Sequence, residues 1–183
     1  LAALYKDVGG MLAAAAAQTL ESIEVIRSIR EAGDQTVERA YPEGDFGEAM
    51  RTVARLIKAD VGLEAACVDL IGWDTHAAQG SIQGAMARLM ERLAGGLTAF
   101  YEDVQDRMDE VSVVVMSEFG RRVRENAALG TDHGRGNMMM VMGGGIHGGK
   151  VYGDWPSLEP EQLVGPGDLA VTTDFRDVVG EII

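Results

Sequence analysis

The sequence predicts an α/β fold in which a mostly parallel or mixed sheet is flanked by helices. Residues 111–116 and 137–142 are short apolar runs without charge, which is typical of strands that are buried on both faces. Residues 64–71 form a third short apolar run, and a long helical pattern separates it from the strand at residue 111. A crossover helix of that length allows the two strands to lie parallel in one sheet.

Four stretches carry the three to four residue spacing of apolar side chains that indicates a helix. The first covers residues 8–32, and the second runs from a capping Asp45 to residue 59. The crossover helix is expected over residues 81–109, and Thr173 or Asp174 is expected to cap a last helix. We expect the first two helices to contribute packing rather than function.

The chain carries a formal net charge of −13 over 183 residues. This charge disfavours binding to nucleic acids or anionic membranes, because the summed field repels polyanions. Cys67 is the only cysteine, so no intrachain disulfide can form, and the alanine run at residues 13–17 is too short to span a bilayer. No repeat or linker is visible, and the chain opens inside a helical pattern. We therefore expect one α/β unit over residues 1–183, as the C-terminal part of a larger domain.

Acidic and imidazole side chains lie next to each predicted strand. Asp74 and His76 follow the first strand, Glu118 follows the second, and Asp132 and His133 precede the third. In extended backbone, residues two apart point to the same side, and ligands of open α/β sheets bind at strand ends. Carboxylates and imidazoles suit Zn²⁺ or Mn²⁺, or a pair of such ions. We therefore predict that these five side chains share a metal site.

Each of these motifs also has a simpler interpretation. In this interpretation, Asp74 only shapes a turn, and His76 is a hydrogen-bonded histidine at the surface. Glu118 then forms an ion pair with a neighbouring arginine. A solvated surface loop between the last two strands is the alternative to a site.

Arginines are concentrated in the same loop of an otherwise acidic chain. Guanidinium groups bind phosphate or sulfate oxygens in a bidentate manner, so the cluster predicts a small anionic substrate. The alternative is that the arginines hold the loop through surface ion pairs. The predicted anion-binding residues are Arg121, Arg122, Arg124 and Arg135.

Residues 144–150 satisfy the G-x-x-x-x-G-K pattern after a predicted strand, which suggests a phosphate loop. Val151 stands where such a loop has a Ser or Thr that binds metal, and the following Tyr-Gly-Asp-Trp-Pro cannot begin the required helix. The pattern therefore does not predict a nucleotide site.

Four long motifs resemble the DUF1501 family of bacterial proteins of unassigned function. They read GWDTHAAQ, VVVMSEFGRRVRENAALGTDHGRGN, GGGIHGGKVYGDWP and VTTDFRDVVGEI, and the resemblance covers essentially the whole chain. The resemblance implies the wider alkaline phosphatase and sulfatase-like superfamily, in which a mixed sheet between helices carries one or two divalent metals. It also implies export to the periplasm by a twin-arginine signal, although no signal is visible in this chain.

The resemblance assigns ligand roles to individual residues. Glu118 matches the aspartate of the superfamily's Thr-Ser-Asp-His-Gly motif, and His133 resembles a later histidine ligand. Asp74 and His76 resemble an earlier pair that is usually spaced further apart. Phe119 departs from the pattern because it replaces a histidine ligand, so one ligand of a full two-metal site is missing.

Two hypotheses of different classes follow. In the first, the protein is a metal-dependent hydrolase of phosphate or sulfate esters that uses Zn²⁺, Mn²⁺ or Mg²⁺. In the second, it is a non-catalytic cell-envelope binding or assembly protein with a vestigial metal site. No catalytic nucleophile is recognisable, because the candidates Thr19 and Ser22 lie on a predicted helix. The sequence does not indicate an oligomeric state.

Overall fold

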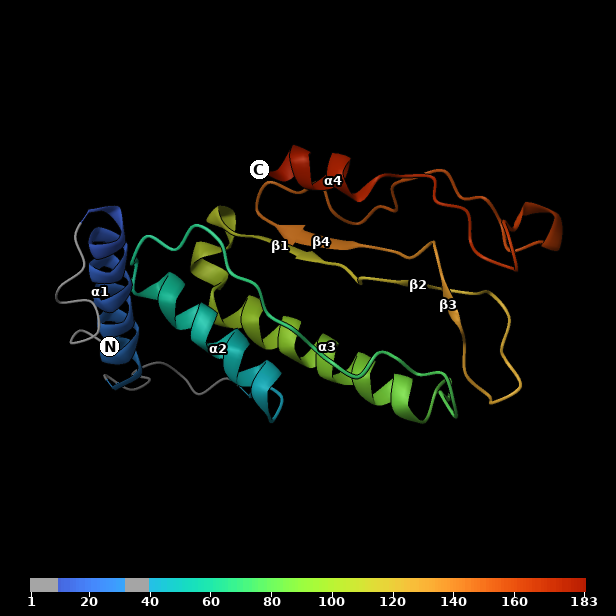
Figure 1. Ribbon diagram of the computed structural model, residues 1–183, viewed down its shortest axis with the longest axis horizontal. Helices are drawn as coiled ribbons and strands as arrows, with labels where there is room; N and C mark the ends of the chain where they lie inside the picture. The colour runs from blue at the N-terminus through green and yellow to red at the C-terminus, as the bar shows by residue number, and fades with distance from the viewer. Residues whose placement is uncertain (1–9, 32–39) are drawn as a thin grey trace. The chain divides into compact units, whose positions relative to one another are not determined.

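A computed structural model describes residues 10–31 and 40–183 of the chain (Figure 1). Its helices and strands confirm a mixed α/β protein. The α-helices are α1 (Met11–Glu31), α2 (Asp45–Lys58), α3 (Ala85–Asp103) and α4 (Phe175–Ile182). The strands are β1 (Ser112–Val115), β2 (Gly120–Arg121), β3 (His133–Gly134) and β4 (Met140–Gly143), and two short 3-10 helices are η2 (Gln105–Glu110) and η3 (Pro160–Gln162). No described helix has both the length and the apolar character needed to cross a membrane.

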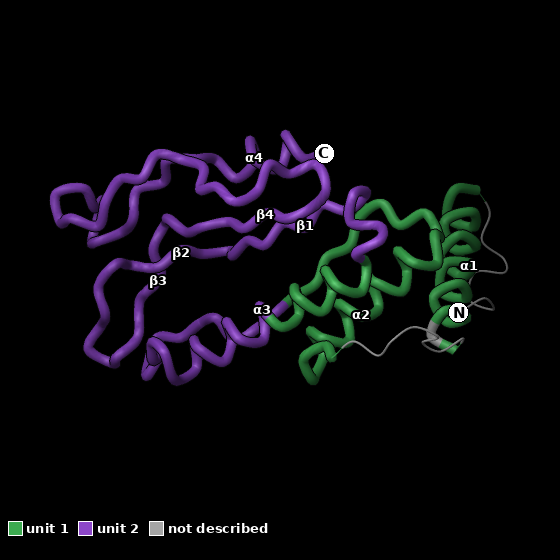
Figure 2. Tube along the Cα trace, turned by 180° about the vertical axis from the view of Figure 1, so that it is seen from behind, with its two compact units in different colours: residues 1–69, 95–104 green, residues 70–94, 105–183 purple. Residues whose placement is uncertain are grey.

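The chain divides into two compact units (Figure 2). The first comprises residues 1–69 and 95–104, and the second comprises residues 70–94 and 105–183. Helix α3 contributes its first half to the second unit and its second half to the first. The sequence showed no linker that would have predicted this division. All of the predicted site residues lie in the second unit.

The first unit has a core built around one face of α2. Phe46, Met50 and Ala54 are buried, and their four-residue spacing places them on one side of the helix. Phe46 packs against α3 at Gly96, where an added Cβ would lie 2.4 Å from its ring. The glycine pair inside α3 therefore marks close packing. The residue that caps α2 is Gly44, and the predicted Asp45 is instead the first residue of the helix.

Both sheets of the second unit are two-stranded and antiparallel. β1 pairs with β4, with Ser112 opposite Gly143 and Val115 opposite Met140, and β2 pairs with β3, with Arg121 opposite His133. The predicted strands at residues 111–116 and 137–142 therefore exist in shortened form. Their pairing is antiparallel, and their residues are exposed or half-buried rather than buried on both faces.

The predicted strand at residues 64–71 is not present in the structure. This segment has no assigned strand and pairs with none of the described strands, so the expected parallel sheet is not found in the part of the chain that the structure describes. An apolar run favours an extended conformation, but a strand forms only when another segment supplies its hydrogen-bond partners. The sequence pattern indicates the extended conformation, but it does not indicate which segment supplies the hydrogen-bond partners.

The crossover helix begins at Ala85 and not at residue 81. Gly80 and Gly84 have positive φ values of 72° and 116°, which glycine tolerates and which interrupt a right-handed helix. The helix ends at Asp103, and η2 follows in place of its predicted last turn. At the other end of the chain, Asp174 caps α4 by accepting a hydrogen bond from the Arg176 backbone N–H at 2.9 Å, as predicted.

Candidate metal centre

The loop between β2 and β3 is organised by the side chain of Asn126. Its Oδ1 accepts hydrogen bonds from the backbone N–H groups of Ala128 at 2.9 Å and Gly130 at 3.1 Å. The Asn126 backbone N–H in turn donates to the Gly130 carbonyl at 2.8 Å. Such side-chain to backbone bonds are typical of asparagine in turns. The loop therefore has a defined local conformation that returns the chain to β3.

The same loop is attached to residues 75–79, about fifty positions earlier. Ala78 and Gln79 donate backbone hydrogen bonds to the carbonyls of Ala128 and Leu129, each at 2.9 Å. The Gln79 Oε1 accepts from the hydroxyls of Thr75 and Thr131, each at 2.8 Å. These bonds hold the segment that carries Asp74 and His76 against the segment that carries Asp132 and His133.

Gly130 allows the two segments to approach closely. A Cβ at this position would lie 2.3 Å from the carbonyl carbon and oxygen of His76 and 2.6 Å from the Thr75 carbonyl oxygen. Any larger residue would therefore push the loop away from the backbone that carries His76.

Asp74 lies between the imidazole rings of His76 and His133. Its Oδ1 is 2.9 Å from His76 Nε2 and 2.7 Å from His133 Nε2, and the two rings have centroids 4.8 Å apart. One ligand atom from each residue lies within 4.8 Å of the other two. Ligands around a tetrahedral Zn²⁺ with bonds near 2.1 Å are about 3.4 Å apart. Small outward movements of the three side chains would therefore make room for one ion.

The three side chains are accessible to solvent. Their exposed fractions are 63% for Asp74, 45% for His76 and 47% for His133. The hydrogen bond with His133 is the largest cause that lowers the pKa of Asp74; desolvation opposes it, and the charges of His76, His133 and Arg121 lower the pKa further. Asp74 is therefore an anion at neutral pH, which is the form that binds a metal.

Phe119 occupies the position at which the family resemblance implied a histidine ligand. Its ring stacks on that of His133, with centroids 4.1 Å apart and an interplanar angle of 13°. The guanidinium carbon of Arg121 lies 4.9 Å from the centre of the Phe119 ring. Phe119 therefore supports the orientation of His133 by packing and supplies no ligand atom.

Asp132 lies beside the cluster and contacts the opposite edge of His76. Its Oδ1 is 3.5 Å from His76 Nδ1 and accepts a hydrogen bond from Asn126 Nδ2 at 2.9 Å. Its Oδ2 accepts from Arg122 at 3.4 Å. The hydrogen bond from Asn126 is the main reason that the pKa of Asp132 is lowered, with further contributions from Arg122 and His76.

Glu118 lies outside the cluster. Its side chain is exposed, and the group of closely spaced ligand atoms found among the described residues comprises only Asp74, His76 and His133. A tight turn lies at this point, because the Ser117 hydroxyl donates to the Phe119 carbonyl at 2.9 Å. The turn is followed by β2, and Phe119 rather than Glu118 contacts His133.

The four predicted anion-binding arginines divide into two pairs. Arg121 donates hydrogen bonds to the backbone carbonyls of Trp73 and Thr131, and it thereby ties the two ligand-bearing segments together. Arg122 pairs with Asp132 and lies 3.8 Å from Asp168. Arg124 and Arg135 are exposed and form no ion pair with any residue in the described ranges.

Sequence reasoning did not identify Asn126, Gln79 or Asp168 as parts of this arrangement. An asparagine side chain commonly accepts a hydrogen bond from the backbone two residues further on and so favours a turn, which makes the role of Asn126 predictable. Gln79 and Asp168 act on residues that are far away in the sequence. Asp168 is 7% exposed and joins Arg122 through an antiparallel bridge that no local pattern indicates.

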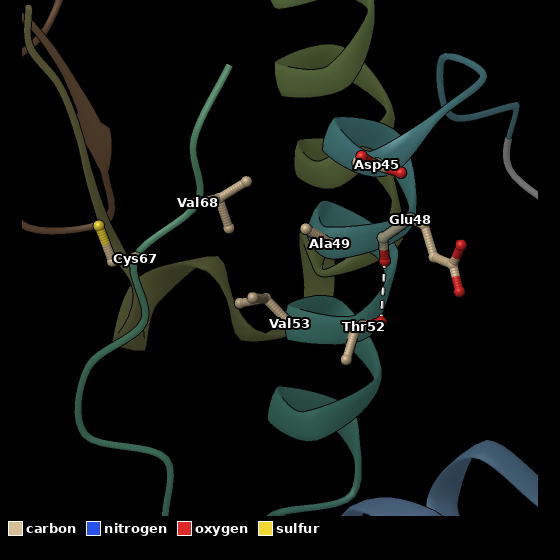
Figure 3. A pocket seen from close by; sticks show the side chains of 7 residues that line it. All are labelled: Asp45, Glu48, Ala49, Thr52, Val53, Cys67 and Val68. Carbon is tan, nitrogen blue, oxygen red and sulfur yellow. Dashed lines mark hydrogen bonds between the residues drawn. The ribbon is translucent and has the colours of Figure 1, made fainter. Parts of the chain in front are cut away.

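A hollow of about 360 Å³ lies in the first unit (Figure 3). Val53 and Ala49 of α2 point towards Val68 of the extended segment, and Cys67, Thr52, Glu48 and Asp45 complete the lining. Its lining includes no imidazole, and its two acidic residues belong to the first turn of α2. The closely spaced imidazole and carboxylate ligand atoms therefore belong to the exposed cluster of the second unit and not to this hollow.

The fold and the cluster define a mixed α/β protein in which two imidazoles and a carboxylate lie together, with one ligand atom of each within 4.8 Å of the other two. The family model described as Protein of unknown function (DUF1501) matches residues 5–178, and the chain belongs to this family. Neither the curated proteins nor the solved structures included a match to it.

Proposed function

We propose that Asp74, His76 and His133 bind one divalent metal ion and that the protein is a metal-dependent hydrolase of phosphate or sulfate esters. The observation that supports this most strongly is the convergence of both Nε2 atoms on one Asp74 oxygen, at 2.7 and 2.9 Å. Catalytic zinc sites commonly have three protein ligands of this kind and an open fourth position. The alkaline phosphatase and sulfatase-like superfamily that the family resemblance implies supports the same class of reaction.

The ligand chemistry favours Zn²⁺ or Mn²⁺ over Mg²⁺. Imidazole nitrogens suit zinc, whereas magnesium prefers oxygen ligands and retains several waters. A bound ion would polarise the ester oxygen and lower the pKa of a coordinated water to about 7. The exposure of the cluster leaves room for an ester to approach from solvent. Because Glu118 is outside the cluster and Phe119 is not a ligand, we propose a single ion rather than a pair.

Arg124 and Arg135 are the arginines that could contact an anionic substrate. Arg121 and Arg122 already donate to carbonyls and carboxylates of the chain, so binding an ester would cost them those partners. Thr75, which follows Asp74, is buried and bonded to Gln79, so its hydroxyl is not arranged as a nucleophile. We therefore propose that water attacks the ester.

The second hypothesis, a non-catalytic cell-envelope binding or assembly protein with a vestigial metal site, is favoured by one observation. The cluster side chains are 45–63% exposed, whereas hydrolytic sites usually exclude water and surround the reacting groups. Under either hypothesis the proposed location is the periplasm, which is supported by the family resemblance.

A substrate screen distinguishes the two hypotheses. The purified protein is incubated with phosphate monoesters, phosphate diesters and sulfate esters in the presence of Zn²⁺, Mn²⁺ or Mg²⁺. The hydrolase hypothesis predicts turnover that requires the metal and that is lost in His133→Ala. His147→Ala is the matched control, because His147 is exposed and its carbonyl accepts a bond from Tyr152 outside the cluster. Absence of turnover by metal-loaded protein favours the binding or assembly role.

A further inference from the structure

The two ring nitrogens of His76 face two different carboxylates. Nε2 is 2.9 Å from Asp74 Oδ1, and Nδ1 is 3.5 Å from Asp132 Oδ1. We propose that Asp132 is a positioning residue that holds the proton of His76 on Nδ1, so that Nε2 is free to bind the ion. This inference rests on the proposed metal site and concerns a residue that does not itself contact the ion.

A neutral imidazole carries one proton, and the nitrogen that binds a metal must be the one without it. Metal-bound histidines usually donate the other N–H to a carboxylate or carbonyl, which fixes both the tautomer and the ring orientation. Asp132 is the carboxylate at that position for His76. At 3.5 Å the contact is longer than a good hydrogen bond, and the movement of His76 towards or away from an ion would determine its final length.

The two oxygens of Asp132 are already engaged, which argues against a role as a ligand. Asn126 donates to Oδ1 at 2.9 Å, and Arg122 donates to Oδ2 at 3.4 Å. Asn126 Nδ2 also donates to the His76 carbonyl at 3.0 Å. The Asn126 amide therefore holds both the Asp132 carboxylate and the backbone of His76. Moving Asp132 to the ion would break these bonds.

Arg122 is itself anchored by a third segment of the second unit. Its backbone forms an antiparallel bridge with Asp168, and its Nε lies 3.8 Å from the Asp168 carboxylate. Asp168 is 7% exposed. The position of Asp132 is therefore set by the β2–β3 loop on one side and by the buried Asp168 on the other.

His133 is oriented in a different way. Its ring contacts the Asp74 carboxylate, the tilted ring of His76 and the stacked ring of Phe119, and no second carboxylate of the described residues faces it. The proposal is therefore specific to one histidine. Loss of the Asp132 charge is expected to change the tautomer of His76 and to leave that of His133 unchanged.

Two-bond ¹H–¹⁵N correlation spectra of the histidine rings test this inference. In the zinc-loaded wild-type protein, the proposal predicts that His76 is protonated at Nδ1 and bound through Nε2. In Asp132→Asn, it predicts a change in the His76 signals alone and a loss of zinc affinity of about 10–100-fold, as is typical for outer partners of metal ligands. Asp154→Asn is the matched control, because it removes an equal charge at an exposed position.

The outcomes separate this inference from the proposed function. If wild-type protein binds no zinc, the metal site itself is wrong. If zinc binds and His76 is protonated at Nε2, or if Asp132→Asn binds zinc as tightly as Asp154→Asn, the positioning role is wrong and the metal site stands. The wild-type spectrum needs no variant, so a His76 protonated at Nε2 would overturn the inference even if Asp132→Asn does not fold.

Discussion

His133 Nε2 lies 2.7 Å from Asp74 Oδ1, although 59 positions separate the two residues in the sequence. The contact depends on the hydrogen bonds of Gln79, Asn126 and Arg121, which join the segment after residue 72 to the β2–β3 loop. The cluster is therefore a product of loop architecture, and changes in the loop are expected to affect it as strongly as changes in the ligands.

Gly130→Ala is expected to destabilise the second unit and to weaken metal binding. The added Cβ would lie 2.3 Å from the His76 carbonyl, and relief of that clash requires the loop to move. Overpacking of this kind costs about 1–3 kcal/mol. Chemical denaturation and zinc titration measure the two effects.

Gly145→Ala is the control for this change, because a Cβ at Gly145 meets no atom within 4 Å. Equal stability and equal zinc affinity of the two variants would contradict the role assigned to Gly130.

Arg121→Ala is expected to lower the free energy of unfolding more than it lowers affinity for phosphate. The substitution leaves the carbonyls of Trp73 and Thr131 without their donor, and each unsatisfied carbonyl costs about 1–3 kcal/mol if it stays buried. Arg135→Ala is expected to lower the affinity for phosphate more than the free energy of unfolding, because the Arg135 guanidinium is exposed and forms no ion pair with any described residue. Urea unfolding and phosphate titration of the zinc-loaded protein measure both quantities.

If Arg121→Ala lowers the affinity for phosphate and Arg135→Ala does not, the assignment of anion binding to Arg124 and Arg135 is wrong.

The cap of α4 is expected to depend on pH. Hydrogen bonds from the Arg176 side chain, followed by that from its backbone N–H, lower the pKa of Asp174 from 3.8 to about 2. Because the folded value is the lower one, the cap contributes stability above pH 4 and loses it as the pH falls through about 2. The amide resonance of Arg176 should titrate with a midpoint near 2. A midpoint near 4, together with an unchanged helix, would show that the cap does not form in solution.

Local features of the fold were predictable from the sequence. The β-branched run at residues 111–116 indicated β1, and Asp174 followed by an amphipathic pattern indicated α4. Pairing was not predictable in the same way, because residues 64–71 also form a short, largely apolar run and yet form no strand in the described structure. Which segments pair depends on contacts between distant residues, and those are not encoded in local periodicity.

The candidate site shows the same limit. The spacing of Asp74 and His76 and the pair Asp132 and His133 were visible in the sequence, and the structure brings three of these side chains together. Glu118 was an equally good ligand candidate in the sequence, but it lies outside the cluster. After the turn at Ser117, it is Phe119 that contacts His133. The engagement of Arg121 with two carbonyls depends on the folded loop and has no sequence signature.

Isothermal titration with Zn²⁺ tests the central claim most directly. The account predicts one zinc ion per chain in the wild-type protein, and His147→Ala is expected to bind equally well because His147 is outside the cluster. We expect zinc binding to weaken by at least about 100-fold in each of the variants His76→Ala, His133→Ala and Asp74→Ala. Loss of an outer partner of a ligand costs up to about 100-fold in affinity, and loss of a ligand itself should cost at least as much. Tight zinc binding that survives all three substitutions, or that is lost with His147→Ala instead, would contradict the assignment of these residues as a metal centre.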